Sequence, residues 1–400
     1  MVKKLFGGLG ITILGATLAF ALTGCAEEEI PTQEGSSSQE STAVVTEETA
    51  MEEGDTVTIG GILPLTGEGA AYGDPMQKVA QIALDKVNAA GGVNGKKLSV
   101  IWEDGKCNGA DAANAANKLI NVDKVKVIYG GFCSSETLAI APIAEKAGVV
   151  VLSPGSSSPD ITNAGDFIFR NYPSDASQGK VLAEYVNSKG LKKVAILSEQ
   201  NDYTLGIQKV FEEKFKELGG TVEVQTYLPQ DSDFRTPLVK LKAGTPDALF
   251  INPQTPAKAD LAFKQVEELQ WDVQLIGNDV VAGYQDLISK YKDLVDGMIV
   301  AEFSYDKTNP DFVALADKYR EIAGDEMPYG TYASTSYDAI FILQEAFSIA
   351  GNDPVKIKDY LYAIDGREGL GGSLTIDENG DPKAGHAVEL VKDGKVVAVE

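Results

Sequence analysis

The sequence predicts an α/β protein with two lobes, each built on a parallel sheet that helices cover on both faces. Three observations support this prediction. From Thr56 onward, short apolar runs typical of buried strands alternate with helical patterns. A second series of the same kind begins near Ser177. At 400 residues, the chain is also too long for one ordinary hydrophobic core.

The first series is expected to have strands at residues 57–63, 98–102, 125–129 and 149–152. Its helices are expected at residues 76–89, 110–120 and 137–146. In the first of these helices Val79, Ile82, Ala83 and Val87 share one face, which is the spacing of an amphipathic helix.

The second series is expected to have strands at residues 194–197, 222–224, 248–251, 273–276 and 297–302. Its helices are expected at residues 178–188, 205–218 and 257–269. Two long helical patterns, 311–323 and 331–350, then follow without strands between them, and residues 374–399 are β-rich. These late helices predict that the chain crosses back to the first lobe.

The N-terminal segment, residues 1–24, has the features of a signal peptide. Two lysines precede an apolar run, which ends in Leu22-Thr23-Gly24-Cys25. This ending resembles the lipobox of bacterial lipoproteins, in which Cys25 would carry the lipid anchor. The alternative is an ordinary transmembrane anchor, since the run is long enough to span a bilayer. Residues 26–54 hold nine Glu and neither Lys nor Arg, so 25–54 is expected to be a disordered acidic linker.

The composition excludes several classes of function. A net charge of −24 argues against nucleic-acid binding, which needs a basic face. With one histidine and three cysteines, the chain is a poor candidate for His-based catalysis or a thiolate metal site, and we predict no metal and no cofactor. If Cys25 is lipidated, Cys107 and Cys133 remain, either as a disulfide in an exported protein or as two free thiols.

Small hydroxyl residues follow two of the predicted strands. They lie in Gly130–Glu136 and in Ser153–Pro159. Hydroxyls and free backbone N–H groups at such strand ends bind small anions, above all carboxylates. No catalytic group accompanies them, so the sequence favours a protein that holds a small solute and does not transform it.

Three motif-like segments fail as known motifs. Thr66–Gly73 has Tyr72 where a dinucleotide fingerprint needs a small residue, so we interpret it as a cleft loop that presents Tyr72. Gly155–Pro159 lacks the second glycine of a nucleophile elbow. Asp377–Asp381 lacks the glycine of a calcium loop and is expected to be a hairpin turn on Asn379-Gly380. His386 is interpreted as a surface or packing residue.

The candidates for a ligand site lie at or near predicted strand ends in both lobes. Asp279 follows the strand 273–276 on a loop, at the sheet edge equivalent to that of the serines. An acid opposite a carboxylate-binding edge would suit an ammonium group. The full candidate set is Tyr72, Phe132, Ser134, Gly155, Ser157, Tyr203, Gln254, Asp279 and Tyr332.

From about residue 55 to 400, the chain resembles the leucine/isoleucine/valine-binding family of extracytoplasmic solute-binding proteins, which have the type I periplasmic binding fold and feed ABC permeases. The resemblance rests on motifs that are weak singly and specific in this order. They are Pro64–Gly67 with Tyr72-Gly73, Asn88–Gly95, Cys107 with Gly131–Ser135, Ser153–Gly155, Asn201–Gly206, and Tyr332 with Tyr337–Ala339.

The resemblance implies two flavodoxin-like lobes joined by three crossovers, which close on the ligand by a hinge motion. We place lobe 1 at residues 55–175 plus 304–381 and lobe 2 at residues 176–303 plus 382–400. The resemblance also implies a Cys107–Cys133 disulfide.

The resemblance assigns roles to the candidate residues. Ser134 and Ser157 would bind the α-carboxylate of an amino acid, and the Gly155 carbonyl and Asp279 would bind its α-ammonium. The aromatic candidates would line the side-chain pocket or close over it: Tyr72, Phe132, Tyr203 and Tyr332. The family's amino-acid binders usually have Glu at the position of Asp279 and an aromatic residue at that of Gln254.

The sequence therefore predicts a non-enzymatic, lipid-anchored and monomeric solute-binding protein outside the cytoplasmic membrane. It would deliver an α-amino acid, branched-chain or related, to an ABC permease. The alternatives are a binder of amides, urea-like compounds or small carboxylates, and a sensor subunit without transport.

Overall fold

The computed structural model describes residues 55–399. The predicted signal peptide 1–24, the lipidation site Cys25 and the linker 25–54 lie outside the described residues. Within 55–399, no helix is both long enough and apolar enough to cross a membrane.

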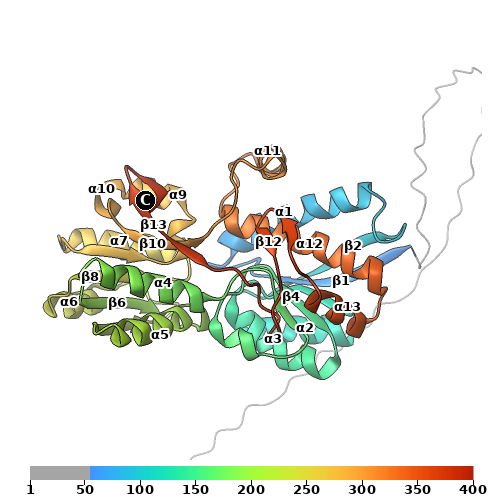
Figure 1. The fold of residues 1–400 in the computed structure, drawn as a ribbon, viewed down its shortest axis with the longest axis horizontal. Coiled ribbons are helices and arrows are strands. Elements are labelled where there is room, and N and C mark those ends of the chain that lie inside the picture. The colour runs from blue at the N-terminus through green and yellow to red at the C-terminus, as the bar shows by residue number, and fades with distance from the viewer. Residues whose placement is uncertain (1–54, 400) are drawn as a thin grey trace, which may run out of the picture. The chain divides into compact units, whose positions relative to one another are not determined.

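The first sheet has five parallel strands in the order β2-β1-β3-β4-β5 (Figure 1). This order is the flavodoxin-like one, in which helices on both faces connect the strands. The strands are β1 (Thr56–Leu63), β2 (Lys97–Asp104), β3 (Val127–Gly130), β4 (Val150–Ser153) and β5 (Ile168–Arg170). The connecting helices are α1 (Ala70–Ala89), α2 (Gly109–Asn121), α3 (Ser134–Ala147) and the short 3₁₀ helix η1 (Pro159–Asn163).

The second sheet repeats this order in its parallel part, β7-β6-β8-β9-β10, and adds two antiparallel strands beside β10. Its strands are β6 (Lys193–Glu199), β7 (Thr221–Tyr227), β8 (Ala248–Asn252), β9 (Gln274–Gly277), β10 (Ile299–Phe303), β13 (His386–Lys392) and β14 (Lys395–Ala398). Its helices are α4 (Asp175–Ser188), α5 (Asp202–Glu217), α6 (Arg235–Ala243), α7 (Pro256–Glu268), α8 (Asp279–Ala282), α9 (Gln285–Lys290) and α10 (Lys292–Val295).

The chain passes three times between the two sheets. It leaves the first sheet after β5, and after β10 it returns through α11 (Pro310–Ala323) and α12 (Gly330–Ala350), which pack against α1. After α13 (Pro354–Tyr362) and the small hairpin of β11 (Arg367–Gly369) and β12 (Gly372–Leu374), it enters β13. The predicted two-lobe fold is therefore confirmed, whereas the residues at which we place the lobe boundaries stay predictions.

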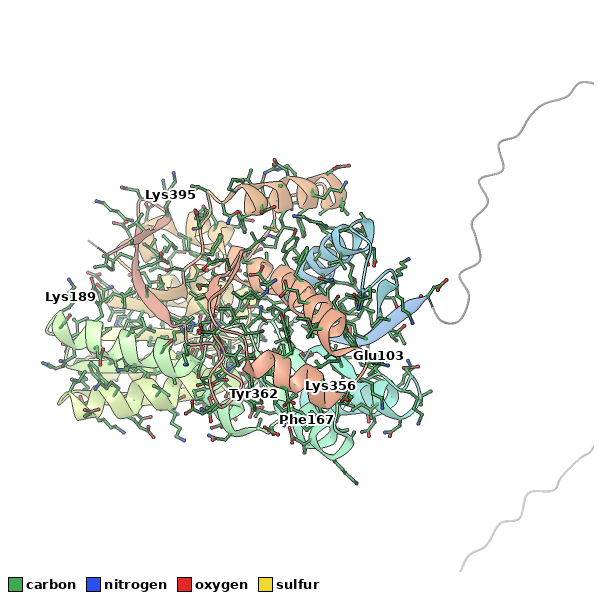
Figure 2. All side chains as sticks on the ribbon, turned by 45° about the vertical axis from the view of Figure 1, so that its right-hand side comes forward. Glu103, Phe167, Lys189, Lys356, Tyr362 and Lys395 are labelled. Carbon is green, nitrogen blue, oxygen red and sulfur yellow. A yellow bond between two sulfur atoms is a disulfide. The ribbon has the colours of Figure 1, made fainter. Side chains whose placement is uncertain are left out.

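Apolar side chains fill the layers between helices and sheets, and charged side chains such as Lys189 and Lys395 lie on the outside (Figure 2). In α1, Met76, Val79 and Ala83 are fully buried. Their spacing places them on one face, and the helix is held because this face is removed from water.

A buried ion pair joins β5 to the last crossover segment. The Arg170 side chain is fully buried, and its Nε and Nη2 donate to the two carboxylate oxygens of Asp381 at 2.6 and 2.7 Å. Asp381 closes the predicted turn, in which the Asp377 N–H donates to the Asp381 carbonyl at 2.8 Å. Gly380 adopts a positive φ of 82° there, which favours glycine.

Two predictions about local structure are wrong. The segment that begins at Thr66 is not a loop as far as Gly73, because α1 begins at Ala70 and places Tyr72 in its first turn. Asp279 is not on a loop either, since it is the first residue of α8. Asn278 makes this helix start possible, because its side chain accepts from the Val281 N–H.

Candidate functional site

The two sheets place their strand ends around one pocket. In each sheet the strand order reverses beside the first strand, between β1 and β3 and between β6 and β8. Loops that follow strands at such a reversal diverge and leave a crevice, where ligands of doubly wound sheets bind. The segments after β1, β3, β6 and β8 carry Tyr72, Ser134, Tyr203 and Gln254, respectively.

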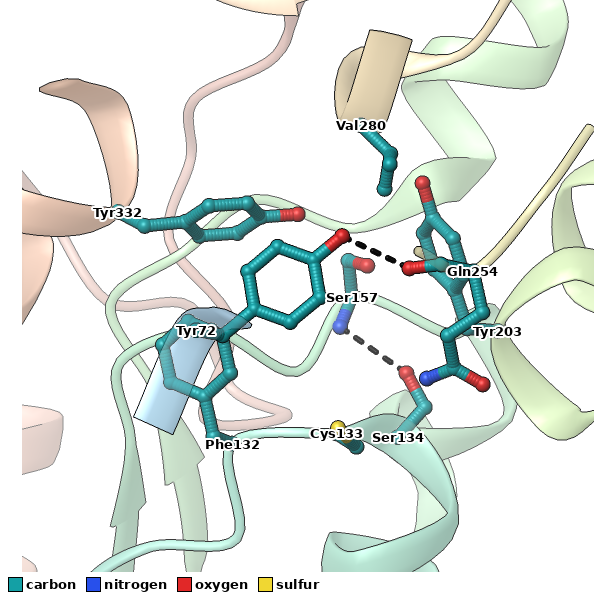
Figure 3. A pocket seen from close by; sticks show the side chains of 10 residues that line it. Tyr72, Phe132, Cys133, Ser134, Ser157, Tyr203, Gln254, Val280 and Tyr332 are labelled. Atoms are coloured by element: carbon teal, nitrogen blue, oxygen red, sulfur yellow. Dashed lines mark hydrogen bonds between the residues drawn. The ribbon is translucent and has the colours of Figure 1, made fainter. Parts of the chain in front are cut away.

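One cavity brings together eight of the nine predicted residues (Figure 3). About 300 Å³ of space that protein atoms do not fill lies around it, and part of this space is open to solvent. The lining residues are Tyr72, Phe132, Cys133, Ser134, Gly155, Ser157, Tyr203, Gln254, Val280 and Tyr332. The ninth, Asp279, is adjacent to the lining residue Val280 and is bonded to two lining tyrosines.

The hydroxyl side of the pocket is built at the start of α3. The Ser134 Oγ accepts from the backbone N–H groups of Ser157 and Ser158, at 3.3 and 3.0 Å. With both acceptor positions used, the Ser134 hydroxyl keeps its own proton to donate. The side chains of Ser134 and Ser157 are almost fully buried. This edge therefore offers a hydroxyl donor at the N-terminus of a helix, which suits an anion.

The acidic side of the pocket is the Asp279 carboxylate, which is 2% exposed. The phenol of Tyr203 donates to its Oδ1, and those of Tyr172 and Tyr332 donate to its Oδ2 at 2.9 and 2.7 Å. Burial, with Asp279 as the next cause, raises the pKa of all three phenols well above 10, so they stay protonated. The three donors hold the carboxylate in one place, and about one of its four lone-pair positions stays available for a cation.

Aromatic rings form the wall between the hydroxyl side and the acid. The ring centroids of Tyr72 and Phe132 are 5.9 Å apart, and those of Phe132 and Tyr332 are 5.2 Å apart. Gly155 packs so closely on this wall that a Cβ there would lie 2.6 Å from the Phe132 ring. Any larger residue at Gly155 would therefore displace Phe132 from the pocket.

Gln254 connects the two lobes at the edge of the pocket. Its carbonyl accepts from the Tyr72 hydroxyl at 2.8 Å, and its side-chain Nε2 lies 3.4 Å from Cys107 Sγ. Its backbone N–H donates to Glu199 at 2.9 Å. Burial raises the pKa of Glu199 to about 7.

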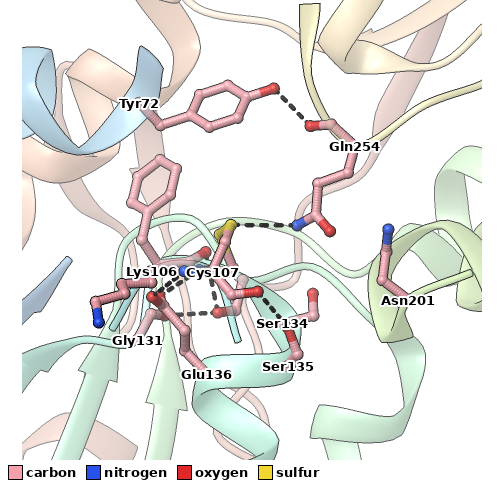
Figure 4. Close-up of a disulfide and its surroundings, with 12 residues drawn as sticks. Tyr72, Lys106, Cys107, Gly131, Ser134, Ser135, Glu136, Asn201 and Gln254 are labelled. Atoms are coloured by element: carbon pink, nitrogen blue, oxygen red, sulfur yellow. Dashed lines mark hydrogen bonds between the residues drawn. A yellow bond between two sulfur atoms is a disulfide. The ribbon is translucent and has the colours of Figure 1, made fainter. Parts of the chain in front are cut away.

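The predicted disulfide is confirmed, because Cys107 and Cys133 are bonded, with their Cα atoms 5.2 Å apart (Figure 4). Glu136 supports the bridge from α3, since its two oxygens accept from the backbone N–H groups of Cys107 and Cys133, each at 2.9 Å. Burial raises the pKa of Glu136 to about 7. The disulfide therefore fixes the start of α3, where Ser134 lies.

His386 lies at the start of β13, as expected, and is a packing residue rather than a surface one. It is 7% exposed, and its Nδ1 is 2.7 Å from the Ser177 hydroxyl. Burial lowers its pKa to about 4, so it is neutral at pH 7.

Sequence reasoning missed Tyr172, which bonds Asp279 and stacks on Tyr332 with ring centroids 4.7 Å apart. Tyr172 lies in the first crossover between the lobes, where no strand-end pattern marks it. The sequence analysis also missed Val280, which lines the pocket because it follows Asp279 in α8. Its place next to the candidate Asp279 was the signal that could have identified it.

Comparisons with known proteins agree on one family. The family described as periplasmic binding protein matches residues 56–394. An amino acid binding protein of Pseudomonas aeruginosa is 30% identical over 344 residues, which cover 85% of this chain and 91% of that protein. A leucine-, isoleucine-, valine-, threonine- and alanine-binding protein of the same organism is 30% identical, covering 82% of this chain and 88% of that protein.

Solved structures give the same result. The crystal structure of a leucine-binding protein from Thermotoga maritima is 30% identical with a TM-score of 0.77, covering 86% of this chain and 98% of that one. A branched-chain amino acid transporter substrate-binding protein from Streptococcus pneumoniae, solved with isoleucine, is 29% identical with a TM-score of 0.76. That comparison covers 86% of this chain and 99% of the other.

Proposed function

The chain belongs to the periplasmic binding protein family, and on this premise we propose that it captures a branched-chain or related α-amino acid for an ABC importer. The observation that carries the proposal is the pairing of opposite chemistries at one small pocket. Ser134 and Ser157 offer donors on one side, and Asp279 offers a carboxylate on another.

An α-amino acid has the two charges that this arrangement suits. Its carboxylate would accept hydrogen bonds from the Ser134 hydroxyl, at the N-terminus of α3, and from the Ser157 hydroxyl. Its ammonium would bind Asp279 and the Gly155 carbonyl. In a closed site water does not compete, so each charged hydrogen bond is stronger than at the surface.

The residues that line the pocket favour a ligand whose side chain is mainly apolar. Tyr72, Phe132 and Val280 line the cavity, and their carbon surfaces favour aliphatic groups. Three of the relatives named above are described as binding leucine, isoleucine, valine, threonine or alanine, or were solved with isoleucine. Gln254, whose amide lies at the same pocket, supports threonine as a further ligand, because it can hydrogen-bond a hydroxyl.

A second candidate function is the capture of a carboxylate without an amino group. A solute-binding protein from Rhodopseudomonas palustris that was solved with 3,4-dihydroxybenzoic acid is 26% identical to this chain, with a TM-score of 0.75. Asp279 argues against this candidate here, because a buried carboxylate would repel such a ligand.

The chain is a binding protein and not an enzyme, and it works outside the cytoplasmic membrane. We further propose that Cys25 carries a lipid that anchors the protein to the membrane, and that a monomer delivers its ligand to ABC permease subunits. A sensor subunit without transport is the alternative to delivery.

Titration calorimetry with L-isoleucine tests the proposal. Asp279→Asn is expected to weaken binding by about 2–5 kcal/mol, because the ammonium loses its charged partner. The matched control is Asp272→Asn. Asp272 is exposed and lies just before β9, whereas Asp279 lies just after this strand. Equal affinity of Asp279→Asn and wild type would remove Asp279 from the site.

The same assay separates the candidate ligand classes. We expect 4-methylpentanoate, which is leucine without its amino group, to bind at least about 30-fold more weakly than leucine. Equal binding of the two would favour the carboxylate binder.

A further inference from the structure

An ion pair between the lobes involves a residue that the ligand site does not use. Glu68 lies in the turn between β1 and α1, within the glycine-rich segment that fails as a dinucleotide fingerprint. Its Oε1 is 3.1 Å from the Nζ of Lys258, which belongs to α7 of the other lobe. The two charges therefore meet only when the lobes are together.

Lys258 is buried more deeply than a lysine usually is. Its side chain is 3% exposed, whereas that of Glu68 is 54% exposed. Within its own lobe, Nζ donates to the Asp231 carbonyl at 3.0 Å. A buried ammonium is stable only with anionic or strongly polar partners, so the loss of Glu68 leaves Lys258 under-compensated.

Another acid of the same lobe, Glu199, is a weaker partner for Lys258. The charge of Lys258 acts to lower the pKa of Glu199, which lies on β6. Burial is the larger effect, and it raises the pKa of Glu199 to about 7. Near neutral pH Glu199 is therefore only partly ionised. Glu68 supplies a second carboxylate, from the other side of the cleft.

Two other contacts from the first lobe reach the same short stretch of the second, Gln254–Lys258. The Tyr72 hydroxyl donates to the Gln254 carbonyl at 2.8 Å, and the Gln254 Nε2 lies 3.4 Å from Cys107 Sγ (Figure 4). Thr255 caps α7 by accepting from the Lys258 N–H, which stabilises the start of this helix. Glu68, Tyr72 and Cys107 thus all contact the first turn of α7 or the residues just before it.

We propose that the Glu68–Lys258 pair is a closure latch, which favours the closed arrangement of the lobes with or without solute and slows the release of a bound solute. This inference rests on the proposed function for its effect on ligand release. Because Glu68 is half exposed, salt screens the pair, and the latch weakens as ionic strength rises.

Stopped-flow measurement of L-isoleucine release tests the latch. Glu68→Gln is expected to raise the dissociation rate about 3–10-fold at low salt, with a much smaller change in the association rate. At 0.5 M NaCl the wild-type rate is expected to approach that of the variant. The matched control is Asp74→Asn, which removes an equal charge from the same lobe but from a pair with Lys78 inside α1.

A double-mutant cycle shows whether Lys258 is the partner. Glu68→Gln is expected to change the release rate little in a Lys258→Gln background, because the interaction is already lost. If Glu68→Gln behaves like Asp74→Asn, or has its full effect in the Lys258→Gln background, the latch is wrong.

Small-angle scattering of the ligand-free full chain tests the latch independently of the ligand. At low salt, Glu68→Gln is expected to have a larger radius of gyration than both wild type and Asp74→Asn, and high salt is expected to remove the difference. Equal radii would overturn the latch. If wild type fails to bind isoleucine, the proposed function is wrong, and the scattering result alone decides the latch.

Discussion

Replacement of Arg170 by methionine is expected to lower the free energy of unfolding by about 3–5 kcal/mol. Arg170 is fully buried, and besides Asp381 it bonds the Ser158 carbonyl at 2.8 Å. Methionine would leave the Asp381 carboxylate, in a residue 7% exposed, with the Thr162 hydroxyl as its remaining side-chain partner. The large cost therefore comes from a buried charge that has lost its counter-ion.

Differential scanning calorimetry measures this effect. For a folded body that spans residues 55–399, the entropy of unfolding is about 0.7 kcal/mol/K, so the expected fall in Tm is about 4–7 °C. The matched control is Arg235→Met, which breaks an exposed pair with Glu268 and is expected to lower Tm by less than about 1.5 °C.

A second variant distinguishes the lost counter-ion from poor packing. Arg170→Met combined with Asp381→Leu is expected to recover most of the lost stability, because no charge is then left buried. If Arg170→Met melts within 1 °C of wild type, or if the double variant is less stable than the single one, the reasoning about the buried pair is refuted.

Three further predictions concern the disulfide, a buried acid and the acid of the site. Replacement of Cys107 and Cys133 by serine is expected to cost about 3.5 kcal/mol, since the bridge closes a loop with a sequence separation of 26, and an unchanged Tm would contradict this. Burial raises the pKa of Glu302 from 4.5 to about 8, so its favourable contribution is complete below pH 4.5 and is lost as pH rises through 8. Glu302→Gln is therefore expected to raise Tm at pH 9 and not at pH 5, and an equal change at both pH values would show that protonation is not the cause. Tyr172→Phe removes one donor to Asp279 and is expected to weaken isoleucine binding about 10–100-fold in calorimetry, whereas unchanged affinity would mean that the remaining phenols suffice.

The fold could be predicted because its central strands, such as β3, β4, β8 and β10, are fully buried and therefore form short apolar runs between helices. Short elements could not be found in this way. β5 has three residues and α8 has four, which is too few for a periodic pattern. No pattern in the sequence marks the early start of α1, since the glycines before Ala70 are typical of a loop.

The site could be predicted where it depends on strand ends, and not where it depends on the approach of distant segments. Ser134 and Tyr203 follow strands of the two sheets, so their positions follow from topology. Tyr172 reaches Asp279 across 107 residues of sequence, and Glu68 meets Lys258 only through the arrangement of the lobes. No local pattern encodes such distances.

The central claim is that the pocket holds both charges of an α-amino acid, and a crystal structure of the full chain grown with L-isoleucine tests it most directly. We expect the carboxylate within hydrogen-bond distance of the Ser134 hydroxyl and the ammonium within hydrogen-bond distance of Asp279. Isoleucine bound outside this pocket, or bound inside it with its ammonium away from Asp279, would contradict the account.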